Sequence, residues 1–363
     1  MDTALFDYEL PKERIAQQPA GERDASRLLV VHRAERRLEH RRFKDVIDYI
    51  RPTDLIFRNA ARVLPARLFA QRPTGGRVEC LLLRPDGGDA STGSECWWCL
   101  LRPGRKLPIG SSFGIEGVFR AEVLDKNENA EYRVGFALPK GMSVARLAED
   151  QGKMPLPPYI ERERDDERDS ADKDRYQTVY ASRERAVAAA APTAGLHFTD
   201  ELTQAIESKG ATFHDLVLHV GMGTFKPLDE GRVEDHEIHR ELYEVPATAQ
   251  QALREGPSQN RRRICVGTTS VRSVEDYLSK TDRIHENGYI DEAGLFIYPP
   301  SSFMGVDALI TNFHMPKSTL LCLVSAFLSP GKTDGIDWLK SIYAEAIEQE
   351  YHFLSYGDAM LIL

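Results

Sequence analysis

The stretch from residue 60 to residue 145 constrains the fold most, because it holds short strand-like runs and no helical period. The runs are separated by turns rich in Gly, Pro, Asp and Asn, and they include Arg77–Leu83, Trp97–Leu101, Gly117–Leu124 and Tyr132–Leu138. Regularly spaced short strands with such turns are typical of small barrels and sandwiches. We therefore predict a small all-β unit inside a longer chain.

Outside this stretch, the sequence alternates between helical and strand-like patterns. Thr199 is placed to cap a helix whose apolar face is Leu202, Ala205 and Ile206, and Gly210 is placed to end it. An almost wholly apolar helix is expected at 320–328 and must be buried. Further strands are expected at residues 212–220, 264–267 and 306–312, and a last helix is expected from about Asp334.

Repeated strand–loop–helix units predict a layered α/β domain whose functional loops lie at the carboxyl ends of the strands. The predicted fold class is therefore α/β, with a layered α/β/α main domain and an inserted small all-β barrel. We place the main domain at residues 1–59 and 150–363 and the barrel at residues 60–149. The charged run at 161–174 is expected to form an exposed loop.

The chain has 363 residues and a net charge of −9, which argues against general nucleic-acid binding but leaves room for local basic faces. No apolar run approaches the roughly 20 residues that span a bilayer. The first residues lack a basic segment followed by an apolar one, so we expect a cytoplasmic protein. The three basic clusters comprise Arg33, Arg36, Arg37, Arg41 and Arg42; Arg102, Arg105 and Lys106; and Arg261, Arg262 and Arg263.

The five cysteines are scattered and predict no disulfide framework. Cys96 and Cys99 have zinc-knuckle spacing, but no second pair of Cys or His follows at a suitable distance. A strand that turns its bulky residues toward the core is the favoured interpretation.

Four of the ten histidines, His197, His219, His236 and His239, belong to motifs between Pro192 and Glu241 that are rich in Gly, Thr or charged residues. Histidines on loops are candidates for acid–base chemistry. The pair His236 and His239 does not complete the H-E-x-x-H pattern of a zinc site, so acid–base or polar substrate contacts are favoured over a metal. The alternative is a metal-dependent hydrolase that uses His219, His236 and His239.

Three loops carry further candidate groups. The segment Gly267–Arg272 offers backbone N–H groups at a helix start, which suits a carboxylate or phosphate, although Ser270 as a simple helix cap explains it equally well. The segment His219–Phe225 fits either a tight loop against a ligand or a plain turn. The segment Thr311–Thr319 brings together Asn312, His314 and Lys317, which a Ser318 cap alone does not explain.

A set of motifs in fixed order resembles the S-adenosylmethionine:tRNA ribosyltransferase-isomerase (QueA) family of queuosine biosynthesis. The motifs span nearly the whole chain: Phe6–Pro11 with Ile15–Gln17, Arg23–Leu28, Lys153–Ile160, Asp174–Ala181, Pro192–Phe198, His219–Phe225, Gly267–Arg272, Thr311–Pro316 and Phe353–Met360. Motifs of this length in one order are far more specific than any one of them.

The resemblance implies an α/β domain with an inserted β-barrel. It also implies that S-adenosylmethionine donates its ribosyl group to 7-aminomethyl-7-deazaguanine at the wobble position of a tRNA with a GUN anticodon, giving epoxyqueuosine-tRNA, adenine and methionine. No metal or redox cofactor is implied, and we expect a monomer without membrane association. Basic residues of both domains are expected to hold the anticodon stem-loop, which would make binding salt-dependent.

The resemblance also suggests roles for residues. The sulfonium acidifies the adjacent ribose carbon, so a base is needed, and the methionine carboxylate needs a cation or a helix N-terminus. The candidate catalytic residues are His197, His219, His236, His239, Glu241 and His314. The candidate substrate-binding residues are Arg23, Asp24, Arg27, Thr193, Gly195, Gly221, Gly223, Thr224, Phe225, Gly267, Thr268, Thr269, Ser270, Arg272, Asn312, Lys317 and Ser318.

The chain departs from the family pattern at two places. It has Ala60 and Ala61 where the family usually has Asp and Thr, and Arg240 where the family usually has Ser. The flanking residues Asn59, Arg62 and His239 are kept. The first departure is expected to change a polar contact at the domain seam, and the second removes a hydroxyl beside a candidate base.

Overall fold

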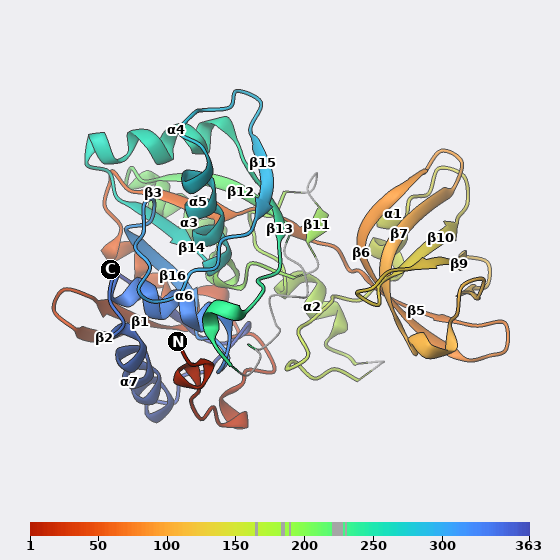
Figure 1. The fold of residues 1–363 in the computed structure, drawn as a ribbon, viewed down its shortest axis with the longest axis horizontal. Coiled ribbons are helices and arrows are strands. Elements are labelled where there is room, and N and C mark those ends of the chain that lie inside the picture. The colour runs from red at the N-terminus through yellow and green to blue at the C-terminus, as the bar shows by residue number, and fades with distance from the viewer. Residues whose placement is uncertain (164–165, 183–185, 189, 220–227, 229–230) are drawn as a thin grey trace.

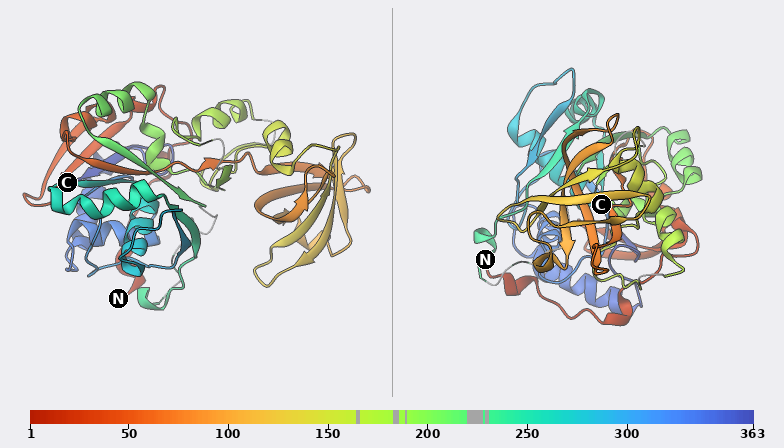
Figure 2. Two further views of the ribbon diagram at one scale, coloured as in Figure 1. Left: turned by 90° about the horizontal axis from the view of Figure 1, so that it is seen from above. Right: turned by 90° about the vertical axis from the view of Figure 1, so that its right-hand side faces the viewer.

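A computed structural model of the chain describes residues 1–163, 166–182, 186–188, 190–219, 228 and 231–363. Figure 1 shows a large α/β body and a smaller barrel at its side, and Figure 2 shows the same separation from above. Both termini lie on the α/β body (Figure 1). Among the described helices, none combines the length and the apolar character that a membrane crossing requires.

The α/β body is built on a nine-stranded sheet in the order β15-β13-β12-β3-β14-β16-β17-β1-β2. Its centre is parallel from β12 to β16, and β17 is antiparallel to β16 but parallel to β1. The strands are β1 (Arg27–His32), β2 (Arg37–Arg42), β3 (Leu55–Asn59), β12 (Thr212–Leu218), β13 (Glu241–Val245), β14 (Arg263–Val266), β15 (Tyr289–Ala293), β16 (Ala308–Asn312) and β17 (Ala359–Ile362).

Helices cover both faces of this sheet. Along β1, Leu29 and Val31 enter one hydrophobic cluster while Leu28 and Val30 enter another, as the two-residue period of a strand requires. The first cluster holds residues of α4 (Ala247–Glu255), α5 (Thr268–Lys280), α6 (Thr319–Leu328) and α7 (Gly335–Glu348), and the second holds residues of α3 (Asp200–Ser208) and the 3-10 segment η4 (Phe43–Tyr49). The layered α/β/α prediction is confirmed.

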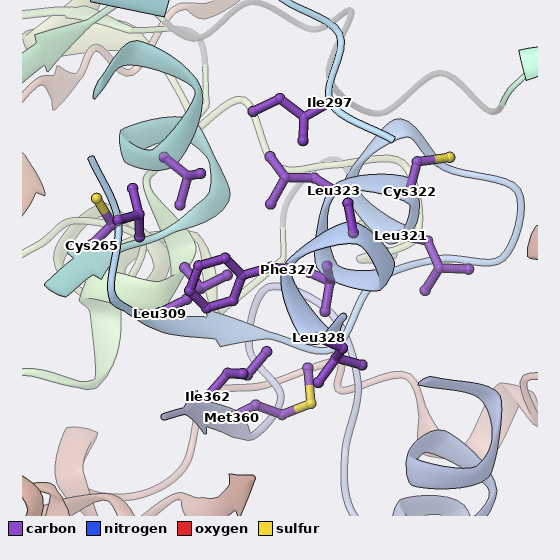
Figure 3. Packing of buried hydrophobic residues seen from close by; sticks show 14 of the residues in the cluster. Cys265, Ile297, Leu309, Leu321, Cys322, Leu323, Phe327, Leu328, Met360 and Ile362 are labelled. Atoms are coloured by element: carbon purple, nitrogen blue, oxygen red, sulfur yellow. The ribbon is translucent and has the colours of Figure 1, made fainter. Parts of the chain in front are cut away.

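Helix α6 is the buried helix that its composition predicts. All residues from Leu321 to Leu328 are buried, and Ser318 caps the helix by accepting a hydrogen bond from the Leu321 amide. Figure 3 shows Leu323, Phe327 and Leu328 of this helix facing the strands that carry Leu309 and Met360. The predicted cap of α3 is also observed, since the Thr199 hydroxyl accepts from the Leu202 amide.

The second part is a closed six-stranded barrel in the order β10-β7-β6-β5-β8-β9, which confirms the all-β prediction. Within β7, Trp97 and Cys99 point into the barrel core, so Cys96–Cys99 is strand and not a zinc knuckle. The strands are β5 (Arg67–Gln71), β6 (Arg77–Asp89), β7 (Ser94–Arg102), β8 (Ser112–Ile115), β9 (Phe119–Lys126) and β10 (Tyr132–Ala137), and the helix α1 (Val144–Gln151) follows them.

The chain enters and leaves the barrel at one point. Beyond the short strand β4 (Arg62–Val63), which pairs with β11 (Ala186–Ala188), the backbones of Arg67 and Lys153 exchange hydrogen bonds of 3.1 and 3.0 Å. Gly152 is required there, because a Cβ at this position would lie 1.8 Å from the Pro65 carbonyl oxygen.

The charged run at 161–174 is not wholly the exposed loop that its composition predicts. Its end forms the helix α2 (Asp169–Arg175), and Asp172 is buried. The Arg162 guanidinium pairs with the Asp172 carboxylate at 2.6 Å, and the Tyr356 hydroxyl donates to the same carboxylate at 2.7 Å. Composition cannot show that two charges of opposite sign will neutralise each other inside the protein.

Candidate active site

A pocket of about 760 Å³ lies at the carboxyl ends of β14 and β16. This is the edge of the sheet where functional loops are expected in α/β folds. Its lining comprises Ala191–Ala194, Gly267–Thr269, Thr311–Pro316, Tyr159, Ser318, Leu320, Leu354 and Ser355. None of these lining residues is Asp, Glu, Lys or Arg, so the described wall is uncharged, with a few hydroxyl, amide and imidazole groups set among apolar side chains.

Two helix N-termini open onto the pocket. Gly267 precedes α5 with φ of +90°, a conformation that favours glycine, and Thr268 and Thr269 form the first turn. Ser318 caps α6 and also lines the pocket. Unpaired amides and the helix dipole at such ends favour a negatively charged group, so the pocket can accept a carboxylate there.

A chain of hydrogen bonds runs from the pocket wall into the protein. The Thr193 hydroxyl donates to Oδ1 of Asn312 at 2.8 Å, and Nδ2 of Asn312 lies 3.2 Å from Nε2 of His197. On the far side of the ring, Nδ1 of His197 lies 2.8 Å from the Ser26 hydroxyl. The four residues come from segments that are far apart in the sequence, and two of them, Thr193 and Asn312, line the pocket.

The hydrogen-bond partners of His197 fix which of its ring nitrogens carries the proton. An amide nitrogen can only donate, so Nε2 of His197 must accept and the ring proton must sit on Nδ1. Burial lowers the pKa of His197 to about 4, which keeps the ring neutral near pH 7. The ring also stacks on Phe43 with a centroid distance of 4.9 Å. His197 therefore orients Asn312 and does not itself reach the pocket in the described lining.

His314 does line the pocket, and it too is neutral. Burial lowers its pKa to about 3. Its Nε2 lies 2.9 Å from the Thr311 hydroxyl, and its backbone is held by the hydroxyls of Tyr343 and Tyr8. A neutral imidazole held this firmly is suited to hydrogen bonding with a ligand, and so low a pKa makes it a weak base.

Gly195 serves packing. A Cβ at this position would lie 2.0 Å from the Tyr180 hydroxyl and 2.9 Å from Cγ2 of Thr178. The absence of a side chain thus lets Tyr180 pack directly behind the segment that carries Thr193.

The side chains of Arg272 and Ser270 bond to groups of the protein that lie away from the pocket. The Arg272 guanidinium pairs with the buried Glu241 carboxylate at 3.0 Å and donates to the carbonyl oxygens of His239 and Ala293, both at 2.7 Å. The Ser270 hydroxyl donates to the Val266 carbonyl at 2.8 Å, so it is neither a helix cap nor a pocket group. Sequence reasoning grouped these residues with Thr268 and Thr269, but they lie on other faces of the same helix.

Three other cationic residues that the sequence predicted to bind substrate contact other groups of the protein instead. Arg23 donates to the Asp174 carbonyl at 2.8 Å and to the Leu196 carbonyl at 3.2 Å, and burial lowers its pKa. Arg27 lies over the Tyr351 ring at 3.8 Å, and Lys317 pairs with Asp7 at 3.2 Å. Neither these residues nor Asp24 is among the described residues that line the pocket.

The remaining histidines lie outside the described wall of the pocket. His236 contacts the Phe296 ring, His239 is exposed, and the His219 amide bonds to the Leu242 carbonyl. In the described part of the chain, no group of three His, Cys, Asp or Glu side chains is arranged to hold a metal ion. The predicted contacts Gly221, Gly223, Thr224 and Phe225 lie outside the described residues.

Sequence reasoning missed four residues of the site. Tyr159 and Ser355 both line the pocket and share a hydrogen bond of 2.7 Å, while Ser26 and Thr311 hold the two buried histidines. All four belong to the ordered motifs, so the signal was present. Their chemistry was not evident, because each hydroxyl acts through a partner that only the fold brings near.

The two departures from the family pattern do not alter the described pocket wall. Ala60 and Ala61 are buried near the barrel entrance, where Asn59 accepts hydrogen bonds from the Ala61 and Leu218 amides. Arg240 is exposed and lies 4.0 Å from Glu292.

The fold and the pocket define an α/β protein with an inserted barrel and an uncharged, hydrogen-bonding site for a small molecule. The chain matches the family described as queuosine biosynthesis protein over residues 3–362, and it belongs to that family. It is 44% identical to a Thermotoga maritima S-adenosylmethionine:tRNA ribosyltransferase-isomerase, with 100% of both chains covered.

Other known proteins agree with this assignment. A Staphylococcus saprophyticus protein with the same name is 42% identical, again with 100% of both chains covered. The crystal structure of S-adenosylmethionine tRNA ribosyltransferase from Thermotoga maritima matches with a TM-score of 0.54 and 36% identity, covering 99% of this chain and 100% of that chain.

Proposed function

We propose that the protein transfers and isomerises the ribosyl group of S-adenosylmethionine onto 7-aminomethyl-7-deazaguanine at the tRNA wobble position. The products are epoxyqueuosine-tRNA, adenine and methionine. The observation that carries the proposal is the family match over residues 3–362, together with full-length relatives of that name. The uncharged pocket between two helix N-termini is compatible with this substrate.

Within the pocket, the N-termini of α5 and α6 are proposed to hold the methionine carboxylate through Gly267, Thr268, Thr269 and Ser318. Thr193 and Asn312 present hydrogen-bonding groups whose orientation His197 and Ser26 fix. His314 bonds directly to the substrate. His197 is thus a positioning residue, because both of its ring nitrogens are bonded to protein groups.

The base that removes the proton beside the sulfonium is proposed to be His219, His236 or His239. His197 and His314 are poor bases at neutral pH, because burial lowers the pKa of each to about 4 and about 3. Replacing each of the three remaining histidines with Ala separates them: the base is the one whose loss lowers kcat by more than about tenfold while the KM for S-adenosylmethionine changes little.

Further features of the proposal come from the resemblance to the family. The tRNA substrate carries a GUN anticodon, the protein is cytoplasmic and monomeric, and no metal or cofactor is needed beyond S-adenosylmethionine as substrate. The chain divides into a main domain of residues 1–59 and 150–363 and a barrel domain of residues 60–149. The metal-dependent hydrolase is not favoured, since the described residues offer no metal-binding group.

Mass spectrometry of a reaction with S-adenosylmethionine and tRNA bearing 7-aminomethyl-7-deazaguanine tests the function. The expected result is release of adenine and methionine with the matching mass gain on the wobble nucleoside, unaffected by a chelator. Binding of tRNA without adenine release contradicts the proposal. Activity that a chelator abolishes would instead favour the hydrolase.

A further inference from the structure

The arginines of the first basic cluster, which lies near β2, bond to groups within the protein. Arg37 and Arg41 both pair with Glu39, and Arg36 pairs with Asp334. Arg33 donates to backbone carbonyls, at 2.9 Å to Phe327 and 2.7 Å to Asp307. Arg42 donates to the Ala25 carbonyl at 3.0 Å. Each guanidinium of this cluster is therefore already engaged within the protein, although two carboxylates do not cancel five positive charges.

The third cluster is also committed to the protein. Arg262 pairs with the buried Asp54 at 2.6 Å, and Arg263 pairs with Asp307 at 3.1 Å. Arg261 donates to the Thr53 carbonyl at 2.9 Å. These arginines fix the starts of β3 and β14, so both clusters of the α/β body have structural roles.

The barrel cluster differs from both. Arg102 ends β7, and Arg105 and Lys106 lie in the 3-10 turn η5 (Gly104–Lys106) that follows. All three side chains are exposed, as is Arg77 on the neighbouring strand β6. Among the residues that the structure describes, none of these four cations has an ion-pair partner.

Arg77 and Arg102 border a groove of about 1290 Å³ between the barrel and the segment Lys153–Asp169. The other cations of this groove are paired, since Arg67 bonds Glu79 at 2.7 Å and Lys153 bonds Asp169. The free positive charge of the groove is therefore concentrated at the barrel side, next to Arg105 and Lys106.

The groove is continuous in sequence with the pocket. Lys153, Met154 and Leu156 line the groove, and Tyr159, three residues further on, lines the pocket. One short proline-rich segment thus forms a wall of both. A ligand seated in the pocket and extended along this wall would reach the unpaired cations of the barrel.

The net charge of the barrel also favours a negatively charged partner. Residues 60–149 contain 13 Lys and Arg against 10 Asp and Glu, whereas the remainder contains 34 against 46. The inserted unit is therefore positive in a chain whose net charge is −9. A local positive surface on an acidic protein favours a specific polyanion and disfavours indiscriminate binding.

We propose that the barrel cluster, defined as Arg77, Arg102, Arg105 and Lys106, binds the sugar–phosphate backbone of the tRNA substrate outside the wobble nucleotide. This inference rests on the proposed function. It narrows the expectation that basic residues of both parts hold the RNA, because the guanidinium groups of the clusters of the α/β body already bond to groups within the protein.

The test is tRNA binding at several salt concentrations for the triple variant R102A/R105A/K106A. Each cation that contacts a phosphate contributes about 0.7–0.9 to the slope of log K against log salt, so the slope should fall in magnitude by about 2–3. In turnover assays, the KM for tRNA should rise while kcat at saturating tRNA and the KM for S-adenosylmethionine stay unchanged.

The matched control is R36A/R37A/R41A, which removes the same number of positive charges from the first cluster, where these side chains pair within the protein, and should leave the salt slope unchanged. The variant R102K/R105K keeps the charge and should bind like wild type. Equal salt slopes for the two triple variants, with equal melting temperatures, would overturn the proposal. That outcome leaves adenine release by the wild type intact, whereas loss of the proposed function would appear as tRNA binding without adenine release.

Discussion

The pocket and the barrel groove recognise their ligands by opposite means. The described pocket wall has no charged side chain, and its groups are held in place by buried hydrogen bonds such as that from Thr193 to Asn312. On the barrel side of the groove, Arg77 and Arg102 are exposed and have no ion-pair partner among the described residues. The pocket therefore selects by geometry at short range, whereas the groove attracts at long range and is sensitive to salt.

The difference also sets how each region responds to mutation. A buried hydrogen-bonded group leaves an unsatisfied partner when it is removed, which costs more than the bond itself contributed. An exposed cation that is removed leaves only water behind. Changes at the pocket should therefore affect stability and turnover, and changes at the barrel cluster should affect RNA affinity alone.

The largest effect is expected at the ion pair between Arg162 and Asp172, which lies at the edge of the groove but, unlike the exposed cations there, is buried. Replacing Asp172 by Ala leaves the Arg162 guanidinium buried without its carboxylate, and the free energy of unfolding should fall by about 3–5 kcal/mol. Denaturant unfolding measures this. The control R146A breaks the exposed pair with Asp150 and should cost less than about 1 kcal/mol. Equal losses would show that Asp172 is not buried in solution.

Acid should destabilise the pocket next most strongly. The pKa of His197 is about 4 in the folded protein and about 6.5 when unfolded, so the unfolded chain binds the proton first. Its contribution is fully present above about pH 6.5 and is lost as pH falls toward 4, by about 3 kcal/mol. Unfolding of the wild type and of His197→Gln between pH 7 and pH 4 checks this. The same pH dependence in both would mean that His197 is accessible to protons in the folded state.

Replacing Asn312 by Ala should lower kcat/KM by about 100-fold, because it frees the Thr193 hydroxyl and leaves Nε2 of His197 without its donor. The control N127A removes a comparable amide from a barrel turn, where Asn127 bonds Glu131, and should leave turnover unchanged. Adenine release under initial-rate conditions measures both. A loss below threefold would mean that the hydrogen-bond chain has no part in catalysis.

A smaller effect, about 1–3 kcal/mol of lost stability, is expected for Gly195→Ala, whose Cβ would meet the Tyr180 hydroxyl. The second change Tyr180→Phe removes that oxygen, which is buried without a hydrogen-bond partner among the described residues, and should restore part of the loss. Gly21→Ala is the control, since no atom lies within 4 Å of its added Cβ. Thermal unfolding that is the same for all variants would contradict the packing role of Gly195.

Local patterns predicted the architecture well, because each of its elements is specified locally. The apolar run at 320–328, the turns of the barrel and the cap at Thr199 all depend on residues near in sequence. The pocket was predicted in part for the same reason: Asn312 ends a strand, and Thr268 and His314 come just after strands.

What the sequence could not show depends on distant partners. Arg272 has the composition of a ligand contact, yet Glu241 on β13 engages it. Ser26 is unremarkable until the fold brings it to a histidine 171 positions away. Three basic clusters look alike in sequence, and only the fold shows that arginines of two of them pair with Glu39, Asp54 and Asp307.

The hydrogen-bonded backbones of Arg67 and Lys153 affect how freely the inserted barrel can change during evolution. The inserted barrel leaves and re-enters its host at adjacent residues, with Gly152 fitted against the Pro65 carbonyl. Because the ends of the insert are already together, the host pays little loop-closure entropy whatever the length of the segment between them. The barrel could therefore be enlarged, reshaped or exchanged over evolutionary time while the host sheet and its pocket kept their register.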